Sequence, residues 1–166
     1  MVLTKAELIG SLQNEVRILL HLATKLDGTS LDYRPTPQQR SSLELLRYLS
    51  LMGPLIIQAA RTGTFDPAAW TAAQQAADGR DLSQTLDVIA GQSDQFTTLI
   101  GDMTDEDFRG EIEMFGRKST RGYFIVNTVL SGYAAYRTQL FLYLKSCGRT
   151  ELNTMNLWGG MDPTPK

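Results

Sequence analysis

The segment from residue 4 to residue 26 carries apolar side chains at alternating spacings of three and four, the period of one helix face. Thr4 precedes Glu7 by three residues, so each side chain can satisfy a free backbone N–H of a first helical turn. The pattern predicts an amphipathic helix that begins at Thr4 and ends near the sequence DGTS at residues 27–30. Its apolar face consists of Ile9, Leu12, Val16, Leu19, Leu20, Ala23 and Leu26.

A second helix is predicted over the sequence LELLRYLSLMGPLIIQAA. Either Thr36 or Ser41 can cap it, because Gln39 and Glu44 lie three residues after them. We expect Pro54 to kink this helix, since proline lacks the N–H that the helix needs.

Two more helices follow. The third is expected between Asp81, which can form a capping box with Gln84, and Gly101. The fourth occupies about residues 120–147 and ends at Gly148, a residue suited to the left-handed position that closes a helix. The expected core face of the third helix is Leu82, Leu86, Ile89, Phe96 and Leu99.

The connections between these helices are long. Residues 62–81 form a crossover in which Asp66 and Pro67 can start a short helix. The connection after Gly101 contains EIEMF, a candidate extended segment. Four long helices and two longer connections predict an all-α four-helix bundle with a long crossover between helices 2 and 3. We expect one domain over residues 1–166, with a surface tail at 150–166 anchored by Leu157 and Trp158.

The charge and composition exclude several classes of function. The net charge of -2 comes from mixed signs along the chain, which argues against a nucleic-acid or membrane partner. The apolar sequence LSLMGPLIIQAA is too short to span a bilayer, and the first residues lack the pattern of a signal peptide. We therefore expect a cytoplasmic protein. The single cysteine, Cys147, excludes an intramolecular disulfide, and no Cys or His pair has zinc-finger spacing.

Few polar residues suggest chemistry by themselves. His21 is the only histidine and points away from the apolar face, so we interpret it as a partly exposed surface residue rather than a ligand or a base. Cys147 lies in the last turn of a helix, where the dipole disfavours a thiolate, and we expect it to be unreactive. Arg117, Lys118 and Arg121 cluster in an expected loop, where solvated charges are favoured over an anion site.

The fourth predicted helix carries several tyrosines on its apolar stripe. Its apolar stripe advances by three and four and is therefore expected to be buried. A buried phenol must find a hydrogen-bond partner, so several phenols on one stripe imply either a polar pocket or ordered water inside the bundle. The stripe consists of Val126, Val129, Tyr133, Tyr136, Leu140, Tyr143 and Cys147.

The sequences LDYRPTPQQRSSLELLRYLS, YRTQLFLYLKSCG and LNTMNLWGG resemble the DinB/YfiT-like superfamily of four-helix bundles. The resemblance implies that three histidines would hold a divalent metal, often zinc or nickel, at one end of the bundle. The matching positions here are Tyr48, Gly132 and Tyr136, or Tyr133 if the helix slips by one. None is a histidine, so no metal cofactor is expected, because phenols are weak ligands beside imidazole and glycine supplies none.

Arg137 and Gln139 match the Arg and Gln that follow the last histidine in that family. The resemblance thus predicts a bundle-end pocket around Tyr48, Gly132, Tyr133, Tyr136 and the two matching residues. Our first hypothesis is a metal-free protein that binds a small molecule or a partner there, as a homodimer by family resemblance. The first alternative is a thiol-dependent S-transferase-like enzyme with a non-standard site, or a metal-free catalyst that uses Tyr48 or Tyr136. The second alternative is a purely structural or interaction bundle with a filled core.

Overall fold

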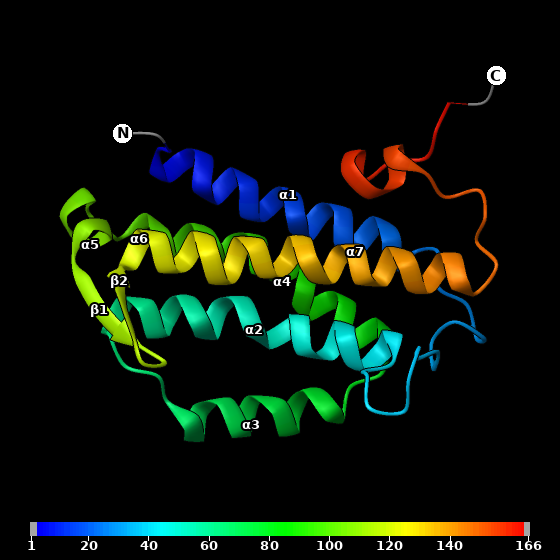
Figure 1. The fold of residues 1–166 in the computed structure, drawn as a ribbon, viewed down its shortest axis with the longest axis horizontal. Helices are drawn as coiled ribbons and strands as arrows, with labels where there is room; N and C mark the ends of the chain where they lie inside the picture. The colour runs from blue at the N-terminus through cyan, green and yellow to red at the C-terminus, as the bar shows by residue number, and fades with distance from the viewer. Residues whose placement is uncertain (1–2, 165–166) are drawn as a thin grey trace.

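Four long helical stretches run side by side around one apolar core (Figure 1). The computed structural model describes residues 3–164. Helices α1 and α2 each contact α4 and α7, so the prediction of an all-α four-helix bundle is confirmed. The four stretches are α1 (Lys5–Ala23), α2 (Ser42–Thr62), α4 (Leu82–Gly101) and the continuous run of α6 (Arg121–Phe124), the π-helix η1 (Ile125–Leu130) and α7 (Ser131–Ser146).

Capping boxes start three of the four stretches. The boxes of Thr4 with Glu7 and of Asp81 with Gln84 form as expected. At the second helix Ser41, not Thr36, is the cap, and its hydroxyl accepts from the Glu44 backbone N–H. The sequence therefore located two of these helix starts to the residue and offered two candidates for the other, because each box satisfies two backbone donors through short, local geometry.

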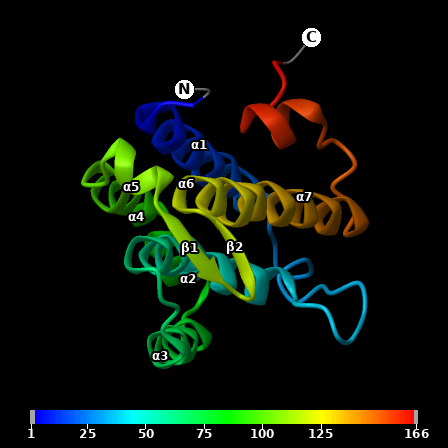
Figure 2. The ribbon, with the colours of Figure 1, turned by 60° about the vertical axis from the view of Figure 1, so that its left-hand side comes forward.

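The predicted crossover contains the short helix α3 (Pro67–Asp78). The Asp66 carboxylate accepts from the backbone N–H groups of Ala68 and Ala69, both at 3.0 Å. Helix α3 contacts α2 on the outside of the bundle, and Figure 2 shows it apart from the other helices. The crossover thus places an additional helix against the outer side of α2.

A β-hairpin crosses one end of the bundle (Figure 2). Strand β1 (Glu111–Met114) confirms the expected extended segment, but the prediction of a loop at Arg117 and Lys118 is wrong. These residues form strand β2 (Arg117–Thr120), which pairs antiparallel with β1. Phe115 and Gly116 turn the chain with φ angles of 52° and 75°, and two positive φ angles suit a tight two-residue hairpin turn. The turn was missed because a phenylalanine rarely adopts a positive φ.

The last long stretch is helical from Arg121 to Ser146 and ends before Gly148, whose φ of 93° is left-handed as expected. The π-helix within it was not predicted. Helix α2 continues through Pro54 to Thr62. An 18-residue window of α2 is apolar enough to cross a membrane, but 61% of it is buried inside the bundle, as in the core helix of a folded domain.

A buried phenol joins three helices at the centre. The Tyr133 hydroxyl of α7 donates to Gln92 Oε1 of α4 over 2.7 Å. The Gln92 amide nitrogen in turn donates to the Leu49 carbonyl of α2 over 2.9 Å. The Tyr133 ring packs against Gly53, where an added Cβ would overlap the Tyr133 hydroxyl. Gly53 is therefore needed for α2 and α7 to approach each other.

We predict that Gly53→Ala lowers the free energy of unfolding by about 1–3 kcal/mol, because the added methyl group must displace a fully buried ring. Gly91→Ala is the matched control, since Gly91 is exposed in α4 and an added Cβ there meets nothing within 4 Å. We expect the control to raise stability by about 0.5–1 kcal/mol through helix propensity. Chemical denaturation followed by circular dichroism measures the free energy of unfolding of both variants. Equal effects would contradict the close packing of Tyr133 against Gly53.

Candidate functional site

Tyr48 of α2 and Gly132 and Tyr136 of α7 line one open groove with a volume of about 540 Å³. We call it the α2–α7 groove. Helix α2 and the η1–α7 run form its floor, while Phe65, Trp70 and the hairpin residue Phe115 add further walls. The structure therefore brings together the three positions that the family resemblance singled out, although they are up to 88 residues apart in the chain.

Tyr48 and Tyr136 meet edge to face, with ring centroids 5.3 Å apart. Burial, and then the neighbouring Tyr136, raise the pKa of Tyr48 to about 12, whereas the nearby Arg40 acts in the opposite direction. The Tyr48 hydroxyl is therefore protonated at neutral pH and is suited to donate a hydrogen bond. This raised pKa makes it a poor general base.

The polar part of the groove comes from η1 and the start of α7. Asn127, Thr128 and Ser131 line the groove beside Gly132. Asn127 and Thr128 belong to the π-helix, and single π-helical turns inside α-helices are frequent at functional sites. Gly132 leaves space here, because an added Cβ would lie 3.2 Å from the Met52 methyl carbon.

The other three predicted pocket residues lie elsewhere. Tyr133 is in the core, where burial raises its pKa and the backbone of Gly53 and the side chain of Gln92 act against that rise. Gln139 donates to the Tyr143 hydroxyl, and both line a neighbouring groove. The buried stripe also differs from the prediction, because Tyr136 is half-buried and Arg137 is buried in its place.

Arg137 forms an ion pair with Glu15 of α1, with 2.7 Å between Nε and Oε2. Burial raises the pKa of Glu15, and the Arg137 charge opposes that shift. Arg137 also donates to the Leu157 carbonyl, and its guanidinium lies 5.2 Å from the centre of the Trp158 ring. It therefore connects α1, α7 and the C-terminal segment. Sequence reasoning missed Glu15 because it followed only the apolar residues of the first helix.

The C-terminal segment, which includes the π-helix η2 (Met155–Gly159), packs across α1. Leu152 and Asn156 are its buried anchors. Trp158, which was expected to anchor the segment by burial, is instead 66% exposed and contacts the Arg137 guanidinium. The Asn156 amide nitrogen lies 3.1 Å from His21 Nε2 and donates to Asp162 over 2.9 Å. The segment thus covers His21, whose side chain is only 15% exposed.

The remaining sequence candidates have structural roles. The Arg121 side chain donates to the Ala60 carbonyl over 2.9 Å, which removes it from the expected cluster of solvated charges. Burial, and then the Asp27 charge, raise the pKa of the Cys147 thiol. A raised thiol pKa agrees with the expectation that Cys147 is unreactive.

The groove does not fit a divalent transition metal. Its polar side chains are phenols, hydroxyls and one amide, while zinc and nickel prefer imidazole, thiolate and carboxylate ligands. Within residues 3–164, no cluster of three or more His, Cys, Asp or Glu side chains could hold a metal ion.

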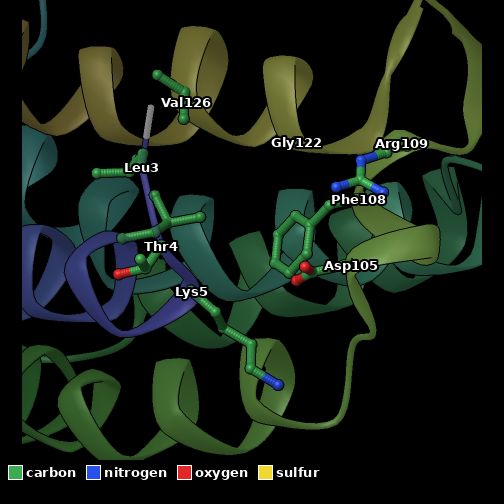
Figure 3. Close-up of a pocket in the computed structure, with 9 residues that line it drawn as sticks. Leu3, Thr4, Lys5, Asp105, Phe108, Arg109, Gly122 and Val126 are labelled. Carbon is green, nitrogen blue, oxygen red and sulfur yellow. The ribbon is translucent and has the colours of Figure 1, made fainter. Parts of the chain in front are cut away.

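A smaller cavity of about 190 Å³ lies between the start of α1, helix α5 (Asp105–Arg109) and α6 (Figure 3). Figure 3 shows the Phe108 ring and the Asp105 carboxylate on one side and Thr4 and Lys5 on the other. The Lys5 ammonium group donates to the carbonyls of Gly101 and Met103, at 2.6 and 3.0 Å. This cavity therefore borders a structural cap at the end of α4.

The fold is similar to that of a DinB-like protein, YjoA from Bacillus subtilis, whose crystal structure superposes with a TM-score of 0.67. The two sequences are 18% identical, and the match covers 88% of this chain and 94% of YjoA. Comparisons of the sequence with protein-family models and with curated proteins give no significant match. The chain therefore has the DinB-like all-α fold, which confirms the family resemblance at the level of structure.

We predict that the protein loses stability as the pH falls from about 7.5 to 5.5. Burial, and then the positive charges of Lys25 and Arg17, lower the pKa of His21 in the folded state, while Asp162 opposes that effect. The unfolded chain therefore takes up the proton first, near pH 6.5, and protonation favours unfolding. Urea denaturation across this range measures the trend.

His21→Gln is the control variant for this prediction, because its amide oxygen can still accept from Asn156 but does not titrate. We expect a flatter pH profile for it between pH 5.5 and 7.5. Wild-type stability that rises toward pH 5.5, or the same profile in both proteins, would contradict the role of His21.

Proposed function

We propose that this protein binds a small organic molecule in the α2–α7 groove and lacks the metal chemistry of its metal-binding relatives. The observation that carries the proposal is the groove itself. Tyr48, Gly132 and Tyr136 line a space of about 540 Å³, within the range of roughly 300–1,000 Å³ that is typical of ligand sites.

The chemistry of the groove supports this function. Apolar and aromatic side chains form most of its lining, and a few polar groups converge on it from Tyr48, Tyr136 and η1. That combination is typical of sites for small organic ligands. The donor set supports a metal-free site, because the groove offers no ligand that zinc or nickel prefers.

The alternatives have weaker support. The raised pKa of Tyr48 counts against a phenolate catalyst at neutral pH, and a thiol-dependent transferase would need another way to activate its thiol. The open groove counts against a purely structural bundle with a filled interior. A homodimer and a cytoplasmic location remain proposals, and sedimentation velocity and cell fractionation test them.

We predict that naphthalene-2-carboxamide, a neutral planar probe, binds in the groove with micromolar to millimolar affinity. The protein has two tryptophans, Trp70 in the groove and the exposed Trp158 far along the chain. Proton–nitrogen correlation spectra resolve their two indole N–H signals, and Trp158→Phe assigns them. We expect a saturable shift of the Trp70 signal and none of the Trp158 signal.

Ala135→Phe is the blocking variant, because Ala135 is exposed on α7 and lines the groove. A larger ring there should fill the groove without disturbing the core, and we expect the Trp70 shift to disappear. The same shift in Ala135→Phe would contradict binding in the groove, and an unmoved Trp70 signal in the wild-type protein would contradict binding of this neutral probe.

A further inference from the structure

Five aromatic rings form a continuous wall along the α2–α7 groove. Successive centroids lie 5.3 Å apart from Tyr136 to Tyr48, 6.1 Å from Tyr48 to Trp70, 5.6 Å from Trp70 to Phe65 and 5.4 Å from Phe65 to Phe115. All five rings line the groove. Aromatic pairs prefer edge-to-face and offset contacts at such distances, so the wall suits the flat body of an aromatic ligand.

The groove lining carries no formal charge among the described residues, but a cation lies beside it. The guanidinium carbon of Arg40 is 4.1 Å from the centre of the Tyr48 ring. The two interact by the attraction of a cation for an aromatic face. This contact holds the guanidinium next to a ring of the groove wall, although Arg40 itself is exposed on the loop before α2.

Arg40 differs from the arginines that have structural roles. Arg34, Arg137 and Arg149 form ion pairs with Glu44, Glu15 and Glu151. Over residues 3–164, no carboxylate lies within 4 Å of the Arg40 guanidinium, so its donors are available to a ligand. Asp66, which lines a different pocket next to Phe65 and Trp70, is occupied as the cap of α3.

We propose that the ligand of the groove is a planar aromatic compound with a carboxylate or a similar anionic group, its ring against the aromatic wall and its anion at Arg40. This inference rests on the proposed function. A planar guanidinium can bind a carboxylate through two parallel hydrogen bonds. The same positive charge disfavours an organic cation, which the aromatic wall alone would also attract.

The hairpin turn supplies the outer edge of this site. Phe115 is 64% exposed and contacts Phe65, and its positive φ is unusual for a bulky residue. Such backbone strain is concentrated at ligand clamps and similar functional positions. Phe115 therefore forms the outer end of the wall on a turn that presents its ring to a bound aromatic compound.

Titrations of the full chain with three matched probes test the inference through the Trp70 indole signal. The probes are naphthalene-2-carboxylate, the neutral naphthalene-2-carboxamide and the cation (2-naphthylmethyl)trimethylammonium. We expect the carboxylate to bind roughly tenfold more tightly than the carboxamide, because one charge-assisted hydrogen bond to Arg40 adds about that much affinity. The cation should bind most weakly. Arg40→Gln should remove the advantage of the carboxylate and leave the affinity for the carboxamide unchanged.

Arg109→Gln is the matched control, because Arg109 is also exposed and lies at the smaller cavity near α5. It should leave all three affinities unchanged. If the carboxamide or the cation binds as tightly as the carboxylate, or if Arg40→Gln has no effect, the ligand class is wrong and the proposed function stands. If none of the probes moves the Trp70 signal, the ligand class and the proposed function both fail.

Discussion

The hydrogen bond from Tyr133 to Gln92 fixes the rotation of α7 in the bundle. Because the Gln92 amide also donates to Leu49, this buried contact joins α2, α4 and α7 at one point. Burying these polar groups is favourable only when each has a partner. Gly53 completes the arrangement, since it allows the Tyr133 ring to lie directly against α2.

The rotation of α7 determines what the neighbouring residues face. In an α-helix each residue advances by about 100°, so Gly132 and Tyr136 lie on the same side of Tyr133, about 100° and 60° from it. That side faces Tyr48 across the groove. Arg137 lies about 40° from Tyr133 in the opposite direction, where it meets Glu15 of α1. One inward phenol thus separates the groove face of α7 from its ion-paired face.

Local signals in the sequence predicted much of the fold. Three capping boxes predicted helix starts and Gly148 predicted a helix end, because caps depend on residues only three or four apart. Buried polar partners were harder to predict. Gln92 and Glu15 occupy core positions that an apolar period cannot reveal, since their burial depends on partners 41 and 122 residues away. The hairpin and the anchoring of the C-terminal segment by Asn156 likewise depend on tertiary contacts. For the candidate site, the family resemblance predicted Tyr48, Gly132 and Tyr136, which line one groove, while the aromatic wall and the contact of Arg40 with it could be seen only in the structure.

A DinB-like fold does not by itself define a function, because one fold can support different sites. The proposed function implies that the three positions matched to the family's metal ligands lie close together and that only their side chains differ. Metal analysis of the triple variant Tyr48→His, Gly132→His, Tyr136→His beside the wild-type protein tests this most directly. Both are purified without a histidine tag and incubated with zinc or nickel. We expect one tightly bound metal ion per chain in the variant and none in the wild type. Stoichiometric metal in the wild type, or none in a folded variant, would contradict it.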